Sequence, residues 1–129
     1  REQRGGLYGS WKDGFQSLKP FHWNLESGNQ LLEIPVTTMP IARTPIHASY
    51  LLYLAKFTAP VARFYFKTAL QLCQLGKITP SFLLHPTDFL GKEDVPEMSY
   101  FPAMDQPRAW KGDRMFEFLI LLKQRWVGL

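Results

Sequence analysis

The sequence predicts an α/β fold in which two parallel strands are connected by a long crossover helix. Residues 31–38, Leu-Leu-Glu-Ile-Pro-Val-Thr-Thr, are rich in strand-forming types. Between residues 48 and 73, apolar residues recur at steps of three and four, which is typical of one buried helix face. A second apolar run follows at residues 81–84. A strand, a helix and a strand in this order predict a β-α-β unit over residues 31–91.

The composition is that of a globular protein with a mildly basic surface. With 129 residues, 46% of them hydrophobic and 20% charged, the chain is long enough for one domain with its own core. Its net charge of +4 favours an anionic partner, such as a phospholipid surface or an acidic glycan. Nucleic acid is not expected as a partner, because the basic residues are scattered rather than clustered.

The cellular compartment is only weakly constrained by the sequence. Cys73 is the only cysteine, which excludes an intramolecular disulfide bond and favours a reducing compartment. The longest aliphatic and aromatic run, residues 118–122, is far too short for a transmembrane helix. We therefore expect no transmembrane segment, and we favour a cytoplasmic or membrane-peripheral location, although the sequence assigns neither.

Residues 1–30 are predicted to form a long loop that is held in place by aromatic side chains. Five glycines and one proline interrupt any regular periodicity in this stretch. Its aromatic residues are Tyr8, Trp11, Phe15, Phe21 and Trp23. Their rings either cover a core, which is the commoner role, or form a platform on which a sugar ring stacks, with Trp11 and Trp23 as the substrate-binding residues.

Glu33 stands in the middle of the first predicted strand. A carboxylate that is buried there alone would be costly. Glu33 is therefore either satisfied by an arginine or by backbone amides, or it is a site carboxylate that orients a neighbouring group. Pro35 cannot donate a hydrogen bond to a ladder, so we expect an edge or a bulge at this point of the strand.

The second predicted strand delivers His85 to its carboxyl end. In α/β proteins a titratable group at this position is often catalytic, although a single histidine before a proline can also be a hydrogen-bonded turn residue. Asp88 either fixes the tautomer of the imidazole or caps the turn that follows. Upstream, the predicted helix is divided at Pro60, with Thr58 placed to cap its second part.

The remainder of the chain, residues 92–129, is predicted to be an irregular loop followed by a terminal helix. This helix is expected to start at Pro107, where an acidic residue precedes the proline, and its apolar stripe reaches Trp126. The chain is accordingly a single domain or a fragment with three parts: residues 1–30, residues 31–91 and residues 92–129.

The segments 31–38 and 80–91 (Pro-Ser-Phe-Leu-Leu-His-Pro-Thr-Asp-Phe-Leu-Gly) together resemble the carboxyl-terminal part of polysaccharide deacetylases, the NodB-homology group of carbohydrate esterases. The similarity runs over most of residues 1–126. It implies the carboxyl-terminal part of a distorted (β/α)7 barrel of the NodB type, which is incomplete as a barrel on its own. It also implies removal of acetyl groups from an N-acetylated glycan or glycolipid by hydrolysis that a divalent, zinc-like metal assists.

The resemblance also implies roles for three residues. Leu84 and His85 match the Leu-His motif on the last barrel strand of these enzymes. There the histidine is the general acid to the leaving amine, and the leucine lines the acetyl pocket. Glu33 matches more weakly, as an orienting carboxylate on the strand that elsewhere carries the fourth motif.

The metal-binding motifs of the family do not occur in the sequence. Members hold the metal with an Asp and two His, on a T-F-D-D motif and an H-x-x-x-H-type motif. The three histidines of this chain also lack any spacing that marks a metal site. Since residue 1 is Arg rather than Met, we expect the chain to be a portion of a longer enzyme, to bind no metal by itself and to be inactive when isolated.

Two other functions stay open beside the deacetylase. One is a non-catalytic glycan- or lipid-binding module that uses residues 7–23 and the basic surface. The other is a structural fragment whose exposed strand edges drive formation of a homo-oligomer or pairing with a missing amino-terminal half.

Overall fold

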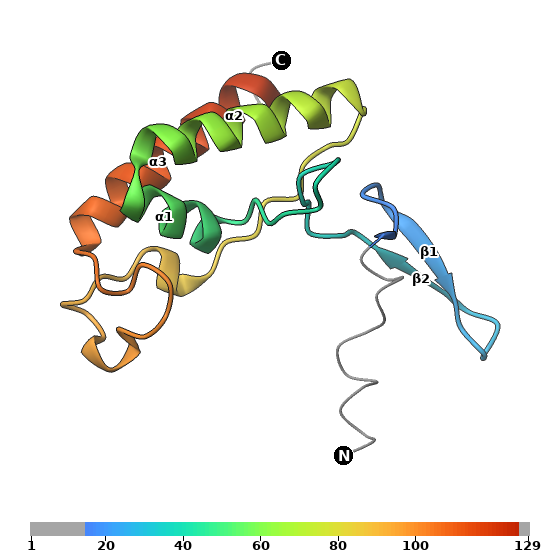
Figure 1. The fold of residues 1–129 in the computed structure, drawn as a ribbon. Helices are drawn as coiled ribbons and strands as arrows, with labels where there is room; N and C mark the ends of the chain where they lie inside the picture. Colours follow the sequence, from blue (N-terminus) through green and yellow to red (C-terminus); the bar gives the residue numbers. More distant parts are fainter. Residues whose placement is uncertain (1–14, 127–129) are drawn as a thin grey trace.

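The computed structural model describes residues 15–126, which contain three α-helices, a β-hairpin and two short 3₁₀ turns (Figure 1). The elements in chain order are β1 (Phe21–Asn24), β2 (Gln30–Glu33), α1 (Ala48–Phe57), α2 (Ala59–Leu75), η3 (Pro86–Asp88), η4 (Pro96–Met98) and α3 (Arg108–Trp126). Trp11 and the rest of the predicted aromatic platform up to residue 14 lie outside the described residues.

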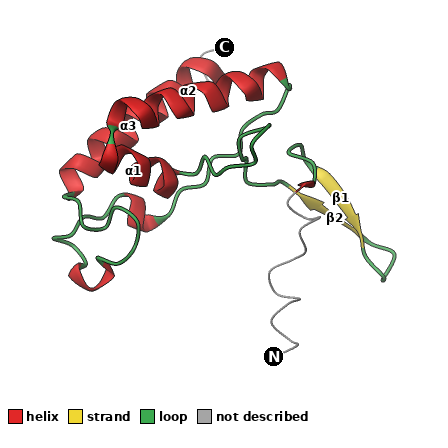
Figure 2. Cartoon of the chain, in the orientation of Figure 1, coloured by secondary structure: helices red, strands yellow, loops and turns green. Residues whose placement is uncertain are grey.

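The three helices pack against one another around a common apolar core (Figure 2). α1 contacts both α2 and α3, and α2 also contacts α3. The predicted helical stripe is confirmed except at Ala59, which is only half-buried. Its other members on α1 and α2 are buried: Ala48, Leu51, Leu52, Ala55, Ala62, Phe66, Ala69, Leu70 and Cys73. The ring of Phe66 contacts those of Phe82 and Phe118, with ring centroids 5.5 and 5.7 Å away. Between residues 15 and 126, no helix has both the length and the hydropathy that a membrane crossing requires.

A corner at Thr58 separates α1 from α2, as the sequence predicts. Thr58 has extended backbone angles (φ −156°, ψ 113°), and its hydroxyl accepts a hydrogen bond from the amide of Val61 at 3.3 Å. Pro60 lies in the first turn of α2, where an amide N–H would have no partner within the helix. The long periodic segment therefore forms two helices that lie side by side.

Residues 21–33 form an antiparallel hairpin, whereas the sequence predicts a loop that leads into a parallel strand. β1 pairs with β2 in a register that places Phe21 opposite Glu33 and Trp23 opposite Leu31. β2 ends at Glu33, because Pro35 has no N–H with which to extend the ladder. The predicted strand over residues 31–38 is thus formed only in its first half.

Residues 81–84 are extended but join no ladder within the described part of the chain. Their backbone instead bonds to two separate segments. The Ser81 carbonyl accepts from the Thr37 amide at 3.1 Å, and the Leu83 carbonyl accepts from the Ala48 amide at 3.1 Å. The predicted parallel pairing is therefore not formed here, since the sheet among residues 15–126 is two-stranded and antiparallel. The barrel stays a prediction, because its other strands would come from outside these residues.

The loop that precedes α3 closes tightly onto the start of that helix. Gly91 lies so near the backbone of Arg108 that any Cβ at position 91 would collide with the Arg108 amide nitrogen. The same amide donates to Glu93 Oε1 at 2.8 Å, and the Arg108 guanidinium forms an ion pair with Asp94 at 2.9 Å. The helix therefore begins close to the predicted position, but a glutamate from the preceding loop holds its first amide.

Candidate functional site

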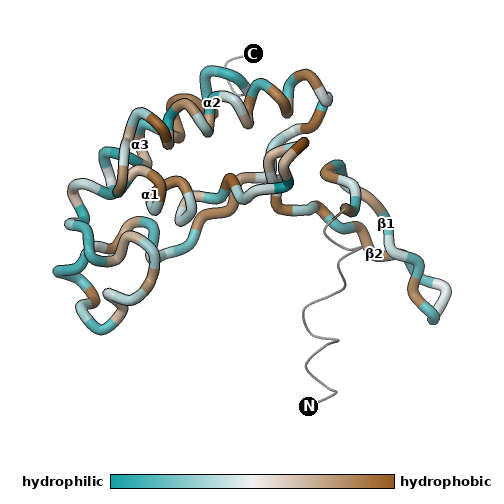
Figure 3. The backbone as a smooth tube through the Cα atoms, in the orientation of Figure 1, coloured by the Kyte–Doolittle hydropathy of each residue, from teal (hydrophilic) through white to brown (hydrophobic). Residues whose placement is uncertain are grey.

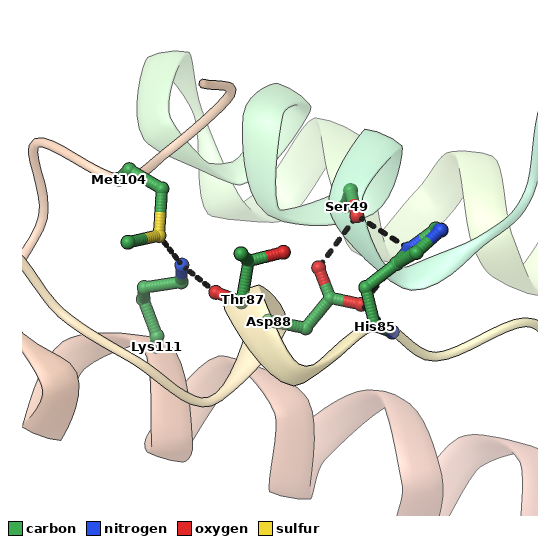
Figure 4. Close-up of polar contacts among 6 residues, drawn as sticks. All are labelled: Ser49, His85, Thr87, Asp88, Met104 and Lys111. Atoms are coloured by element: carbon green, nitrogen blue, oxygen red, sulfur yellow. Dashed lines mark hydrogen bonds and ion pairs between the residues drawn. The ribbon is translucent and has the colours of Figure 1, made fainter. Parts of the chain in front are cut away.

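The candidate site lies where the turn η3 meets the first turn of α1 (Figure 4). His85 precedes η3 and ends the extended segment 81–84, while Asp88 is the last residue of η3. Ser49 projects toward both of them from α1. The backbone bond between Ala48 and Leu83 holds the two segments together directly beside these side chains.

Asp88 is a buried carboxylate whose two oxygens are both used. Its Oδ1 accepts a hydrogen bond from the Ser49 hydroxyl at 2.6 Å, and its Oδ2 accepts one from the His85 amide at 2.7 Å. The Asp88 amide in turn donates to the His85 carbonyl at 2.9 Å. Of the two roles predicted for Asp88, the turn cap is formed, whereas its distance of 3.7 Å from His85 Nδ1 is too long for a hydrogen bond, so Asp88 can act on the ring tautomer only through Ser49.

The contacts of the His85 ring define which nitrogen faces the solvent. Nδ1 lies 3.2 Å from the Ser49 oxygen. Because the Ser49 proton is directed to Asp88, the Ser49 oxygen accepts from His85 Nδ1–H, and this assignment follows from the hydrogen-bond network. Nε2 has no hydrogen-bond partner among residues 15–126, and the side chain is 46% exposed. The site therefore presents Nε2 of an oriented imidazole.

A second imidazole, that of His47, faces the first. The ring centroids of His47 and His85 are 6.1 Å apart and the ring planes are nearly perpendicular, at 83°. Burial lowers the pKa of His47, and the neighbouring His85 lowers it further, whereas Asp88 opposes the change. His47 Nδ1 is buried and has no hydrogen-bond partner in the described part of the chain. His47 therefore loses its proton more readily than a fully solvated histidine does.

Lys111 supports the turn η3 from the opposite side. Its side chain is almost fully buried, and its ammonium donates to the Thr87 carbonyl at 2.5 Å and contacts Met104 Sδ at 3.2 Å (Figure 4). Burial lowers the pKa of Lys111, while the carboxylates of Asp88 and Asp105 act in the opposite direction. η3 is thus held between α1, through Ser49, and α3, through Lys111.

Ser49, His47 and Lys111 were not among the residues that the sequence singles out. Ser49 is 36 residues from His85, so no local spacing relates the two. Lys111 does carry a signal, because it precedes Met115 by four residues and Phe118 by seven and so occupies the buried stripe of α3. A lysine at such a position needs a polar partner inside the protein.

The other predicted site residues are divided between two places. Leu84 is next to His85 and is 40% exposed. Glu33 and Trp23 lie together on the hairpin, where the Trp23 indole N–H donates to Glu33 Oε2. The group next to Glu33 is therefore the Trp23 indole. The hairpin projects away from the helices in Figure 1, so these two residues form a place of their own.

The described residues do not fit the metal that the resemblance implies. No three His, Cys, Asp or Glu side chains between residues 15 and 126 lie close enough to hold an ion. His22 is on β1 of the hairpin, away from the His47–His85 pair. Ligands for a divalent metal would have to come from outside this part of the chain.

Comparisons with models of protein families, with curated proteins and with solved structures found no match to this chain. The similarity to deacetylases accordingly rests on the residues of segments 31–38 and 80–91, and function has to be argued from the geometry around His85.

Proposed function

We propose that the chain supplies the proton-donating part of a hydrolase of the polysaccharide deacetylase type, which removes acetyl groups from an N-acetylated glycan or glycolipid. The observation that carries this proposal is the orientation of His85. Its Nδ1 is engaged by Ser49, which is itself bonded to the buried Asp88, and its Nε2 is free for a substrate. His85 is the general acid, and the half-exposed Leu84 beside it borders the acetyl group.

The arrangement favours donation of a proton from Nε2. When the C–N bond of the acetamide breaks, the departing nitrogen takes the Nε2 proton, and the ring keeps its Nδ1 proton on Ser49. Asp88, 3.7 Å from Nδ1, stabilises the positive charge of the ring before the transfer. A positioned general acid of this kind contributes about 10²–10⁴-fold to the rate.

The proposal covers the proton donor and no step at a metal. No group of His, Cys, Asp or Glu within residues 15–126 could hold an ion, so the proposal assigns none of these residues to the activation of water. Because we expect the isolated chain to lack deacetylase activity, the test uses the protein that the whole reading frame encodes.

The test is acetate release from N-acetylated chito-oligosaccharides by that longer protein. His85→Ala should lower kcat by about 10²–10⁴-fold, because the leaving amine then departs without its proton donor. The metal content should stay unchanged. His22→Ala is the matched control, since it removes an exposed histidine from the hairpin and should keep full activity. Equal turnover of His85→Ala and the unmodified protein would remove the assignment.

We propose self-association as a second function, because large apolar side chains of β2 and of the segment that follows it are exposed. Side chains alternate between the two faces of a strand, so Leu32 and Ile34 project on the side opposite to Glu33. They are 52% and 63% exposed. A second copy of the chain would cover this face and the free edge of β2 at once.

Light scattering after size exclusion tests this second proposal over a range of protein concentrations. The unmodified chain should show a mass that rises with concentration, and Leu32→Lys should shift it toward the monomer. Gln71→Lys, at an exposed position of α2, is a control that leaves the hairpin unchanged. A monodisperse monomer at every concentration would contradict self-association.

A further inference from the structure

A small pocket lies on the other face of the hairpin, between the strands and the loop that follows β2. Its volume is about 230 Å³, and residues of both strands and of this loop line it. The residues that matter for its chemistry are Phe21, Trp23, Glu33 and Arg43. Sites for drug-sized ligands span roughly 300–1,000 Å³, so this pocket accepts one ring rather than a chain of them.

The strand pairing determines which side chains meet in the pocket. Phe21 stands opposite Glu33, and Trp23 is two residues further along the same face. The Phe21 and Trp23 rings meet edge to face with centroids 5.3 Å apart. The Trp23 indole N–H is directed to Glu33 Oε2, which fixes both groups, while Glu33 Oε1 has no hydrogen-bond partner among the described residues.

Arg43 adds a cation from the facing loop, and its backbone is strained. Its φ of 55° lies in the left-handed region that a residue with a Cβ rarely adopts. The Arg43 amide bonds to the Met39 carbonyl at 2.8 Å, which closes the turn, and its guanidinium donates to the Gln16 carbonyl at 3.0 Å. It forms no ion pair with a carboxylate between residues 15 and 126. The two hydrogen bonds hold Arg43 in this conformation, with its guanidinium at the pocket.

We propose that this pocket binds a single pyranose ring of a glycan. An aromatic face receives the C–H face of a sugar, while its hydroxyls both donate and accept hydrogen bonds. Glu33 Oε1 accepts from one hydroxyl, and the remaining guanidinium N–H groups of Arg43 donate to others. A phosphate is disfavoured, because Glu33 would repel it at close range. The choice of an N-acetylated sugar as ligand rests on the proposed function, whereas the pocket itself does not involve His85.

The test is a titration of the chain with tri-N-acetylchitotriose, followed by the ¹⁵N–¹H signal of the Trp23 indole. Trp23→Phe identifies that signal by its disappearance. A site for one sugar ring should give a dissociation constant on the order of 1 mM. The Trp23 signal should shift and saturate, and Glu33→Gln should weaken binding several-fold, because a neutral amide is the weaker acceptor.

Arg43→Gly is the decisive variant, because it removes the guanidinium and the backbone strain together. It should fold at least as well as the unmodified chain and bind the sugar about tenfold more weakly. Lys77→Gly is the matched control. Lys77 is also a cation at positive φ, 51°, but it lies outside the pocket, so its replacement should leave the affinity unchanged.

Two results would overturn the pocket assignment. One is an unmodified chain whose Trp23 signal does not shift at sugar concentrations well above the expected dissociation constant. The other is an Arg43→Gly variant that binds as tightly as the Lys77→Gly control. Binding is measured without catalysis, so the two proposals can fail separately. If the chain binds the sugar but His85→Ala leaves deacetylation unchanged, the pocket is retained and the deacetylase proposal is rejected. If the chain does not bind the sugar but His85→Ala abolishes deacetylation, the deacetylase proposal is retained and the pocket is rejected.

Discussion

The helices bury their apolar residues, whereas the hairpin leaves its apolar residues exposed. Leu51 and Phe66 in the helices are fully buried, whereas Leu31 and Leu32 on β2 keep more than half of their surface exposed. Figure 3 shows hydrophobic residues along the hairpin strands as well as the helices, although no helix covers the strands. Burial of apolar area is worth roughly 25 cal/mol per Å², and a two-stranded hairpin alone is marginal. The His85 site therefore stands on the stable part of the chain, and the sugar pocket stands on the part that opens first.

The largest expected effect contrasts the two regions directly. Phe66→Ala should lower the free energy of unfolding by about 3–5 kcal/mol, because it leaves a cavity beside Phe82 and Phe118. Leu32→Ala on the hairpin should cost less than about 0.5 kcal/mol. Urea denaturation followed by circular dichroism measures both values. A Leu32→Ala cost as large as that of Phe66→Ala would show that the hairpin is covered in solution.

The next effect tests whether the helical core excludes a charge. Burial raises the pKa of the Cys73 thiol from 9.0 to about 11. Between these two values the unfolded chain has lost the proton and the native chain still holds it, so stability must fall as the pH rises. The loss should reach about 2–3 kcal/mol near pH 11.

Cys73→Ala is the matched control for this pH dependence. Denaturation at pH 8 and near pH 11 should give a smaller fall in stability for Cys73→Ala than for the unmodified chain. An identical fall in both proteins would mean that the thiol is not buried in solution.

A smaller effect is expected from the contact that connects α1 to η3. Ser49→Ala deprives the buried Asp88 Oδ1 of its donor and should cost about 1.5–2 kcal/mol. It also releases His85 Nδ1, which the ¹⁵N shifts of the imidazole report as a mixture of tautomers. Ser99→Ala removes an exposed hydroxyl and should change neither quantity. A single, unchanged tautomer in Ser49→Ala would contradict the role of Ser49.

The smallest effects are expected when a residue with positive φ is replaced by glycine in each of the two regions. Arg43→Gly and Lys77→Gly each relieve a left-handed residue and should stabilise their surroundings by up to about 1 kcal/mol. Lys77 lies in the turn directly after α2, which ends at Leu75, so its variant should raise the global stability. Arg43 faces the hairpin, so its variant should slow amide hydrogen exchange only in residues 21–44. If Arg43→Gly slowed amide hydrogen exchange in the helices as much as Lys77→Gly does, the hairpin and the helices would unfold as one unit.

The parts that sequence reasoning predicts well are those whose signal is local. Neighbouring residues are enough to predict the buried helical stripe, which includes Leu51 and Phe66. The same is true of the corner at Thr58–Pro60. The segment 81–84 is different, because an apolar run becomes a strand only if a partner strand lies beside it, and its backbone finds Thr37 and Ala48 instead. Which segment pairs with residues 81–84 depends on the tertiary structure and cannot be predicted from the residues of this segment alone.

The candidate site shows the same limit at the level of side chains. His85 and Asp88 are three residues apart, so their relation is visible in the sequence. Ser49 and Lys111 reach the turn across 36 and 24 residues, and only the folded chain brings them there. The partner of Glu33 was likewise out of reach of the sequence, because its contact with Trp23 is set by the hairpin register.

The close approach of Gly91 to Arg108 also limits how this sequence can diverge. A library of variants selected for folding should keep glycine at position 91, since every other residue would force the loop away from the start of α3 and break the contacts of Glu93 and Asp94. Gly112, on α3, has open space around it and should readily give way to alanine, which is the better helix former. Two glycines that look alike in the sequence thus differ in which substitutions they tolerate. The amino-acid frequencies at positions 91 and 112 among the selected variants would show that difference.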